Sequence, residues 1–289
     1  MLTVLFDGVA YGMVLFILAC GLAVTLGLMN LMNLVNLAHG AFAMAGGYAA
    51  LVLVNHWGVP FLAALPLVFL FSALLGALLE RTLYIHVYAR SHFDQVLFSI
   101  GLVFMSVAIV DYLAGSSQQF IAIPDMLRAR FEFLGISMGA YRLLIIVTCG
   151  VIALALHLAL SRTRFGSRLR AAVDDPRVAR GLGINVGVIF AVTFAIGSGL
   201  AGLGGALGAE ILGLDPSFPL KFMIYFLIVV TVGGTSSISG AFLASLLLGI
   251  ADVAGKYYVP EFGAFVIYTV MIAVLIWRPQ GLFGRVATR

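Results

Sequence analysis

The polar residues that could carry chemistry lie mainly in one run near the N-terminus, where Asn30, Asn33, Asn36 and His39 recur every three residues. On an α-helix this spacing drifts by about 60° per step, so the four side chains cover about half of the helix circumference. A helix in lipid could not leave that many amide groups without hydrogen-bond partners. Two interpretations remain open. The side chains form hydrogen bonds between helices, worth about 0.6 kcal/mol each, or they line a translocation pathway together with Gly40. His39 fits a structural hydrogen bond and a gate equally well.

Sequence motifs for nucleotide binding, for a zinc site and for thiol redox chemistry are absent. The chain has no G-x-x-x-x-G-K-[ST] phosphate loop, no H-E-x-x-H and no C-x-x-C. Its five histidines are scattered, and none has a carboxylate or a second histidine at ligand spacing on a helix. Cys20 and Cys149 lie inside apolar runs, which predicts buried thiols and no disulfide. We therefore expect no catalytic, cofactor-binding or metal site, and an enzymatic role is not predicted.

The amino-acid composition predicts which class of protein this chain belongs to. Of the 289 residues, 63% are hydrophobic and 10% are charged, and the mean hydropathy is +1.15. Soluble domains are about 45–50% apolar and about 25% charged. So little charge cannot cover a water-exposed surface, which excludes a soluble enzyme, a secreted disulfide scaffold and a disordered chain. The sequence predicts an all-α polytopic integral membrane protein with one transmembrane domain over residues 1–289.

Apolar runs long enough to cross a bilayer, which takes about 20 residues, divide the chain. The predicted spans are 8–29, 31–54, 59–79, 95–114, 143–160, 185–209, 220–235, 239–254 and 262–277. The second contains the polar run, and the seventh and eighth are short and separated by the Gly- and Ser-rich stretch 233–240, so any of these three could be re-entrant. We expect eight or nine transmembrane or re-entrant helices.

Arginine predicts the orientation of these helices. Arg81 and Arg90 flank one loop, six arginines lie within residues 162–180, and three form the tail after residue 277. Since these places hold 11 of the 16 Lys and Arg residues, the positive-inside rule assigns all three to the cytoplasm. An even number of predicted spans separates these basic segments, which agrees with their lying on the same side of the membrane. Counting the spans back from Arg81 puts the N-terminus and the loop 115–141 outside. The alternating residues at 121–124 and 131–133 predict a short hairpin in that loop.

Acidic residues are rare in the predicted spans. Asp111, Glu210 and Asp252 lie near span ends, where solvation at the interface is the simplest expectation. An ion-coupled carrier or a facilitative channel remains an alternative, with Glu210 or Asp252 as coupling group or with the Asn33, Asn36 and His39 side chains as a selectivity lining.

A row of small residues marks the predicted span 185–209. Gly197, Ala201, Gly205 and Ala209 recur at every fourth position, which allows helices to approach to backbone contact. Packing is the preferred interpretation. A seam that borders the translocation pathway or a partner subunit is the alternative.

The segment 162–184 contains a predicted short helix. Asp175 is a good N-cap and Pro176 a good first residue, which is a simpler explanation of Asp174 and Asp175 than a metal site. Val178 and Leu182 fall on one face, four residues apart, and glycines at 181 and 183 stop the helix. Such a helix suits docking of a separate ATPase. The alternative is that the arginines only set topology and attract anionic lipid.

Four motifs occur in a recognisable order along nearly the whole chain. They are the stretch from Tyr11-Gly12 through Asn36-Leu37-Ala38-His39-Gly40 to Gly46-Gly47-Tyr48, the segment from Arg170 to Ile184, the run Gly233-Gly234 to Gly240-Ala241, and Arg278-Pro279-Gln280-Gly281-Leu282-Phe283-Gly284. In this order they resemble the permease subunits of bacterial ABC importers for branched-chain and other hydrophobic amino acids, the LivH-like kind. Asp175 stands where Asn is usual in that family, and Gly47 where Ala is usual.

The resemblance implies a permease in the bacterial inner membrane with a cytoplasmic C-terminus. Its partners would be a second, related permease as a heterodimer, two ABC ATPase subunits, a periplasmic substrate-binding protein and the lipid bilayer, with no nucleic acid. The cargo would be branched-chain or other small hydrophobic amino acids, with urea, amides or aromatic acids as alternatives within the class. The implied ATPase-docking residues are Ala171, Ala172, Asp175, Pro176, Val178, Ala179, Leu182 and Gly183. Among them, Ala179 is expected to lie on an exposed contact face rather than in the core.

Overall fold

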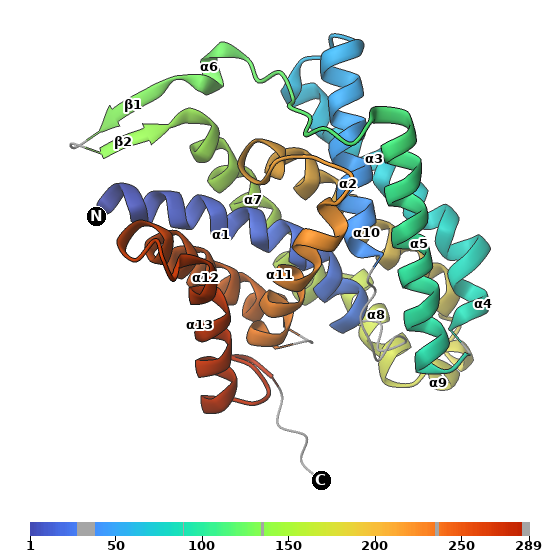
Figure 1. The fold of residues 1–289 in the computed structure, drawn as a ribbon. Helices are drawn as coiled ribbons and strands as arrows, with labels where there is room; N and C mark the ends of the chain where they lie inside the picture. The colour runs from blue at the N-terminus through green and yellow to red at the C-terminus, as the bar shows by residue number, and fades with distance from the viewer. Residues whose placement is uncertain (28–37, 89, 134–135, 235–236, 285–289) are drawn as a thin grey trace.

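Apolar helices make up most of the protein (Figure 1). The computed structural model describes residues 1–27, 38–88, 90–133, 136–234 and 237–284. In chain order the elements are α1 (Leu2–Leu22), the π-helical turn η1 (Ala23–Gly27), α2 (His39–Leu51), η2 (Val52–His56), α3 (Phe61–Leu79), η3 (Glu80–Tyr84), α4 (Ile85–Val87), α5 (His92–Ala114), α6 (Asp125–Arg128), β1 (Arg130–Phe133), β2 (Ile136–Gly139), α7 (Ala140–Arg162), α8 (Arg164–Asp174), α9 (Pro176–Gly181), α10 (Val186–Leu212), α11 (Phe218–Gly233), α12 (Ile238–Tyr258) and α13 (Gly263–Trp277).

Six of these helices are long and apolar enough to cross a membrane. They are Leu2–Thr25, Phe61–Val87, His92–Ala114, Ala140–Arg162, Val186–Leu212 and Ile238–Tyr258, and the shorter α11 and α13 are also apolar. The predicted polytopic, all-α fold is confirmed, and the chain is a multi-pass membrane protein. α12 is a continuous helix of 21 residues rather than a broken one. It follows α11 after a turn in which Gly234 has φ +96°. Residues 31–37 of the predicted second span lie outside the described residues.

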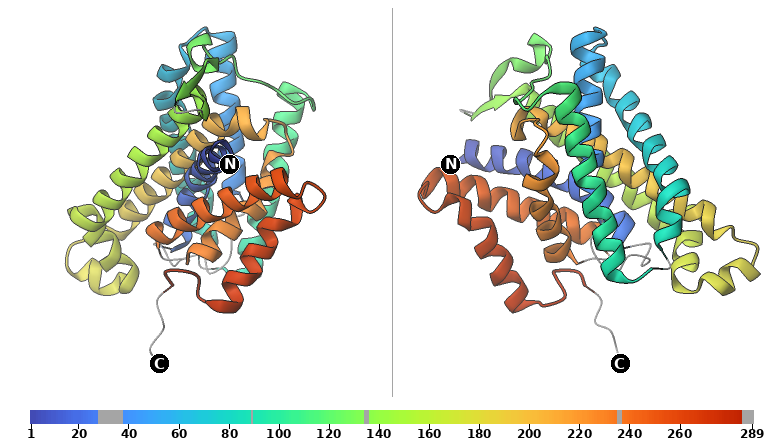
Figure 2. Two further views of the ribbon diagram at one scale, coloured as in Figure 1. Left: turned by 90° about the vertical axis from the view of Figure 1, so that its left-hand side faces the viewer. Right: turned by 45° about the vertical axis from the view of Figure 1, so that its right-hand side comes forward.

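Two helices form the centre of the molecule. α1 is buried along most of its length and packs mainly against α12 and α10, and Figure 2 shows it end-on among the other helices. α10 packs against α3, α2 and α1. By contrast, α5 and α7 are largely exposed, which is expected of apolar helices at the edge of a membrane domain. Helices far apart in sequence therefore build the core.

Small residues allow the close packing around α10. A Cβ added at Gly46 in α2 would overlap the backbone of Gly202, and one at Gly205 would overlap the backbone of Ala43. A Cβ at Gly197 would lie 2.8 Å from the Thr25 side chain and 2.9 Å from the Gly21 carbonyl oxygen, so this end of α10 meets α1 and η1. The predicted packing role is confirmed, because the seam faces helices of the same chain.

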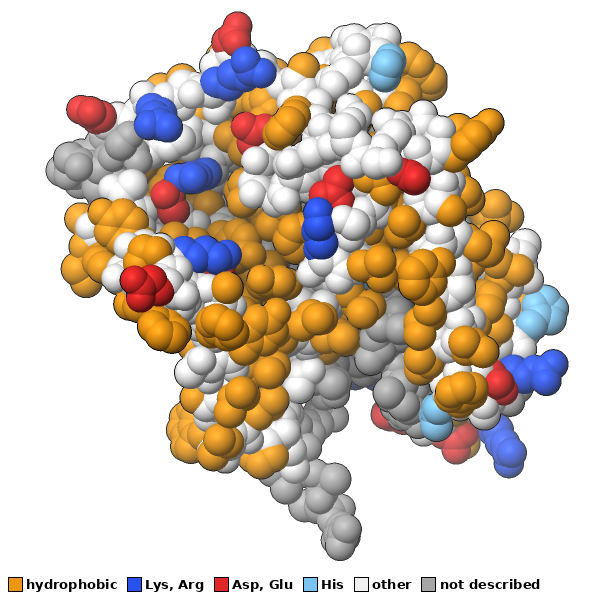
Figure 3. Space-filling view, viewed as in Figure 1, with side chains coloured by type: hydrophobic (Ala, Val, Ile, Leu, Met, Phe, Trp, Pro, Cys, Tyr) orange, Lys and Arg blue, Asp and Glu red, His pale blue; other side chains and the backbone are white. Residues whose placement is uncertain are grey.

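The connections gather at two ends of the molecule. One, the hairpin end, carries the N-terminus, β1 and β2, and the loops at 115–124, 213–217 and 259–262. The other, the arginine-rich end, carries α4, α8, α9 and residues 278–284, whose backbone N–H groups at Leu282 and Phe283 bond to the carbonyls of Val232 and Gly233. In Figure 3 most charged side chains lie toward these ends, and hydrophobic side chains cover much of the surface between them.

The predicted hairpin is present, and it uses the predicted segment 131–133 but not the segment 121–124. Its strands are β1 and β2, which pair antiparallel with Arg130 opposite Gly139. The segment 121–124 is not a strand, because Ile121 and Ile123 bury their side chains in the core. The Asn55 amide holds this segment by donating to the Phe120 carbonyl at 2.8 Å and accepting from the Ala122 N–H at 2.9 Å.

Candidate functional site

Two short helices, α8 and α9, project from the arginine-rich end between α7 and α10 (Figures 1 and 2). Thr163 caps α8 by accepting a hydrogen bond from the Gly166 N–H at 3.4 Å. A Cβ at Gly166 would overlap the backbone of Leu160, so glycine permits the tight turn out of α7. α8 buries Leu169 and Ala172. The sequence analysis missed α8, although Phe165, Leu169 and Ala172 have helical spacing.

The start of α9 is as predicted. Asp175 Oδ1 accepts hydrogen bonds from the N–H groups of Arg177 at 2.8 Å and Val178 at 3.1 Å, and Pro176 is the first helical residue. A cap of this kind is worth about 1 kcal/mol. Past the helix, Gly183 has φ +79° and turns the chain toward α10. Asp175 and Gly183 thus fix the geometry of the segment, rather than presenting a contact surface.

Exposure divides the predicted docking residues into two groups. Val178 is 59% exposed and Leu182 is 73% exposed, whereas Ala179 is 1% exposed. Ala172 is also buried, and Ala171 and Pro176 are half-buried. The expectation that Ala179 lies on an exposed contact face is wrong, because Ala179 packs into the chain's own core. Only Val178 and Leu182 leave large apolar side chains free for a partner.

The charge around these two side chains is positive. The side chains of Arg162, Arg164, Arg168, Arg170, Arg177 and Arg180 are all exposed. Arg170 donates to the carbonyl of Leu160 at 2.5 Å, which ties α8 to the end of α7. A groove of about 340 Å³ runs beside Leu182 and is lined by Arg168, Ile184 and the start of α10. The segment therefore combines an apolar tip, a groove and a cationic border.

His39 occupies a structural position at the start of α2. Its side chain is 2% exposed, its Nε2 lies 2.8 Å from the carbonyl oxygen of Leu18 in α1, and its ring meets Phe226 of α11 edge-on. Gly40 lies beside it, where a Cβ would be 2.9 Å from Pro219 Cα. His39 and Gly40 thus join α1, α2 and α11. The predicted pathway residues Asn33 and Asn36 lie outside the described residues.

The three acidic residues near span ends differ in their surroundings. Asp252 is 1% exposed and pairs with Lys256 at 2.6 Å, so the expected interfacial solvation is wrong for this residue. Lys256 also lies over the ring of Tyr11, 5.6 Å from its centroid. Glu210 and Asp111 are exposed. The burial of Asp252 was missed because the sequence does not reveal that α1 covers this turn of α12, whereas the i,i+4 spacing to Lys256 was a signal for the ion pair.

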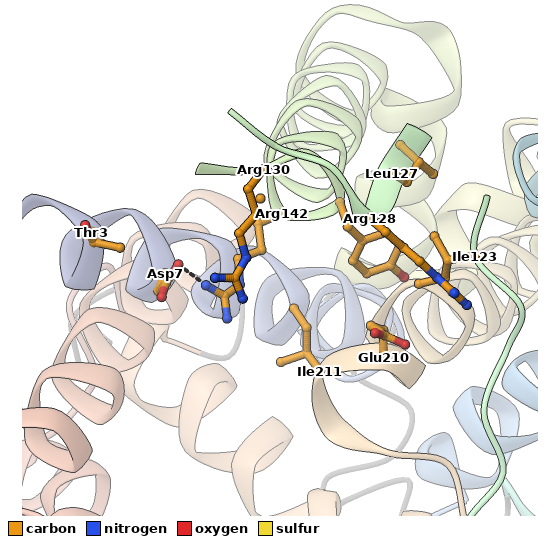
Figure 4. A pocket seen from close by; sticks show the side chains of 11 residues that line it. Thr3, Asp7, Ile123, Leu127, Arg128, Arg130, Arg142, Glu210 and Ile211 are labelled. Atoms are coloured by element: carbon orange, nitrogen blue, oxygen red, sulfur yellow. Dashed lines mark hydrogen bonds and ion pairs between the residues drawn. The ribbon is translucent and has the colours of Figure 1, made fainter. Parts of the chain in front are cut away.

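Glu210 borders a polar pocket of about 670 Å³ at the hairpin end (Figure 4). Arg142 pairs with Asp7 across it, and Arg128 and Arg130 come from the segment around β1. Figure 4 shows the side chains of Arg130 and Arg142 directed toward Asp7, while Arg128 extends past Glu210. This pocket gathers charged groups from α1, α7, α10 and the hairpin on one face.

A second charged group at the hairpin end lies in the loop before α11. Asp215 accepts hydrogen bonds from the Ser217 N–H at 2.8 Å, from the Ser217 hydroxyl and from Lys221 at 2.5 Å. Burial by itself raises the pKa of Asp215, but these bonds outweigh it, and the net pKa lies below its usual range. Asp215 is therefore ionised near neutral pH and holds the Lys221 ammonium group in place.

Known proteins share this architecture and sequence. The family described as "Branched-chain amino acid transport system / permease component" matches residues 4–275. The chain belongs to this family. The permease is 29% identical to the high-affinity branched-chain amino acid transport system permease protein BraD of Pseudomonas aeruginosa, over 97% of this chain and 95% of BraD. It is 26% identical to the corresponding protein LivH of Escherichia coli K12, over 97% and 94%.

Two further similarities concern a second kind of permease and the fold. LivM of Escherichia coli K12, also a permease protein of high-affinity branched-chain amino acid transport, is 26% identical over 93% of this permease and 68% of LivM. A chain of PsaBC from Streptococcus pneumoniae, solved in complex with a Fab, superposes with a TM-score of 0.53 over 96% of this chain and 92% of that chain, at 12% identity. That likeness concerns the fold alone.

Proposed function

We propose that this permease is a membrane-spanning subunit of an ATP-driven ABC importer in the bacterial inner membrane. The observation that carries the proposal is the capped helix α9, which exposes Val178 and Leu182 at the arginine-rich end of a chain of this family. Apolar side chains on a rigid, tightly connected helix can transmit movement of a docked ATPase to α7 and α10. The proposed docking surface is Val178, Leu182 and the groove beside Leu182, while Ala171, Ala172, Asp175, Pro176, Ala179 and Gly183 position it.

The proposed orientation places α8, α9 and the C-terminus in the cytoplasm. The arginine-rich end carries most of the basic residues, and the positive-inside rule supports that assignment. The hairpin end then faces the periplasm, where a substrate-binding protein would deliver its cargo. The names of the BraD and LivH relatives support branched-chain amino acids as cargo. The similarity to both LivH and LivM supports a heterodimer with a second permease.

Reconstitution tests the proposal. The permease is co-expressed with candidate ATPases, a candidate second permease and a candidate binding protein from the same organism, purified and placed in liposomes. We expect the ATPases to co-purify with the permease, and leucine uptake to require ATP and the binding protein. Leucine uptake by the permease alone, driven by an ion gradient without ATP, would show instead that it is a secondary carrier.

A further inference from the structure

A second polar pocket at the hairpin end lies between α5 and the start of α11. It has a volume of about 370 Å³ and is lined by residues of α5, the 116–118 turn, the 215–217 loop and Lys221. Ligand pockets for small molecules begin near 300 Å³, so it can hold one small solute. It belongs to neither the docking segment nor the pocket around Glu210.

The cationic side of this pocket is prearranged. Lys221 Nζ donates one hydrogen bond to Asp215 Oδ2 at 2.5 Å, and its side chain is 54% exposed. Both oxygens of Asp215 are already used, since Oδ1 accepts from the N–H and the hydroxyl of Ser217. An ammonium group has three donors, so Lys221 retains two for a ligand. The remaining bonds suit a carboxylate.

The anionic side is Asp111, near the end of α5. Its Oδ1 accepts a hydrogen bond from the Ser116 hydroxyl at 2.7 Å, which orients the carboxylate. Among the described residues it has no cationic partner. An ionised carboxylate accepts several hydrogen bonds, so Asp111 can accept from an ammonium group. Besides the Lys221–Asp215 ion pair, the pocket therefore holds a second carboxylate, Asp111, which has its own anchor.

An apolar wall completes the pocket. Val107 lies one helical turn before Asp111 on α5, and Pro216 lies on the opposite loop. These two residues can contact an aliphatic side chain, but they do not form a closed pocket that would select one aliphatic side chain over another. The pocket thus presents the two remaining donors of the paired Lys221 ammonium group, the Asp111 carboxylate and a short apolar surface.

We infer that this pocket binds the α-ammonium and α-carboxylate groups of a zwitterionic aliphatic amino acid at the outer mouth of the permease. Lys221 binds the carboxylate, Asp111 binds the ammonium group, and Val107 and Pro216 contact the side chain. The inference rests on the proposed function and adds to it the groups of the substrate that the permease itself recognises. Because the pocket binds groups that all zwitterionic amino acids share, it does not discriminate between their side chains. Selection among side chains is then made by the binding protein.

Protection of an introduced cysteine tests the inference. Cys20 and Cys149 are free but fully buried, so they contribute little background reaction with a membrane-impermeant reagent. Val107→Cys puts a thiol in the pocket, and Met126→Cys, on exposed α6, is the control. The assembled transporter in liposomes without ATP is treated with a small impermeant methanethiosulfonate. We expect 20 mM leucine to slow modification of Val107→Cys at least threefold and to leave Met126→Cys unchanged.

Three further measurements separate the charge pairing from other causes. Leucinamide lacks the carboxylate and 4-methylpentanoate lacks the ammonium group, so neither should protect. Adding Lys221→Met or Asp111→Asn should abolish protection by leucine. Equal protection by all three compounds, protection of Met126→Cys, or an unreactive Val107→Cys would each overturn the inference. ATP-dependent leucine uptake measured on the same wild-type liposomes is independent of protection, so absence of protection with normal uptake refutes the pocket and leaves the proposed function intact.

Discussion

At the scale of single residues, polar side chains in this permease serve mainly to fix helices to one another. His39 bonds the Leu18 carbonyl of α1 and contacts Phe226 of α11, and Asn55 bonds both sides of the 120–122 backbone. Both contacts reach parts of the chain distant in sequence. The sequence identified His39 as notable but left its role open, since the partner carbonyl belongs to a helix whose position no local pattern encodes.

His39→Phe should destabilise the permease. The substitution keeps a ring but removes the hydrogen bond between His39 Nε2 and the Leu18 carbonyl, which is worth about 0.5–1.5 kcal/mol. The midpoint of thermal unfolding, followed by tryptophan fluorescence in detergent, measures the effect. His56→Phe is the matched control because His56 is exposed, and a surface change of this kind stays within about 0.5 kcal/mol. Equal midpoints for the two variants would contradict the structural role of His39.

At the scale of helices, packing depends on glycines whose importance differs with position. Gly46 in α2 meets the backbone of Gly202, whereas a Cβ at Gly101 in α5 would meet nothing within 4 Å. Spacing along the sequence predicted the small-residue face of α10. It did not predict the opposing residues on α1, α2 and α3, because nothing in a single helix specifies which helix lies against it.

Gly46→Ala should therefore weaken the fold while Gly101→Ala should not. The added methyl group forces α2 and α10 apart, and overpacking of this kind costs about 1–3 kcal/mol. At Gly101 the methyl group enters open space, and helix propensity favours alanine by up to about 1 kcal/mol. Thermal unfolding of the two purified variants gives the comparison. A Gly46→Ala variant as stable as Gly101→Ala would show that α2 and α10 are not packed this closely.

The helix α9 shows how far local sequence reasoning reaches. Asp175, Pro176 and Gly183 predicted its start and its end because caps and turns depend on neighbours along the chain. The exposure of Ala179 was predicted wrongly, since Ala179 is buried while its neighbour Val178 is exposed. Which face turns inward depends on α8, which packs beside α9 and which the sequence analysis did not find.

Substitutions on α9 should separate docking from folding. Val178→Glu changes an exposed side chain, so we expect an unchanged thermal midpoint but at least a tenfold loss of ATP-dependent uptake and of co-purifying ATPase. Ala179→Glu places a carboxylate in the core, and we expect it to lower the midpoint by several degrees because an unpaired buried charge is costly. Met126→Glu at the hairpin end is the exposed control. If as much ATPase co-purifies with Val178→Glu as with the wild type, the proposed docking surface is refuted.

At the scale of the whole molecule, few fixed charges lie deep between the two ends. The buried Asp252 lies near the hairpin end of α12, and it is paired with Lys256. A strongly charged solute would therefore cross with little compensation, since removing an ion from water costs several kcal/mol. A zwitterion of small size is the cargo that best suits such a passage. The sequence predicted this from composition, because composition is a global property that needs no knowledge of packing.

Exchange of the binding protein tests how selection is divided within the importer. If a binding protein for another zwitterionic amino acid is supplied and still docks, uptake should switch to that solute with this permease unchanged. Liposome uptake of both labelled solutes, each with each binding protein, gives the measurement. If substitutions at Asn33, Asn36 or His39 set specificity whichever binding protein is present, the permease holds the selective site and the proposed division is wrong.

The central position of α1 has a consequence for how this protein is made. α1 ends at Leu22, but its principal partner α12 begins at Ile238. At a synthesis rate of about 5–20 residues per second, roughly 10–40 s pass before that partner exists. During this interval the first helix to leave the ribosome can meet α7, α10 and α11 but lacks its principal contact surface. Membrane insertion machinery or lipid must therefore cover the α12-facing side of α1 until the last fifth of the chain arrives, and completion of the core is one of the final steps of biosynthesis.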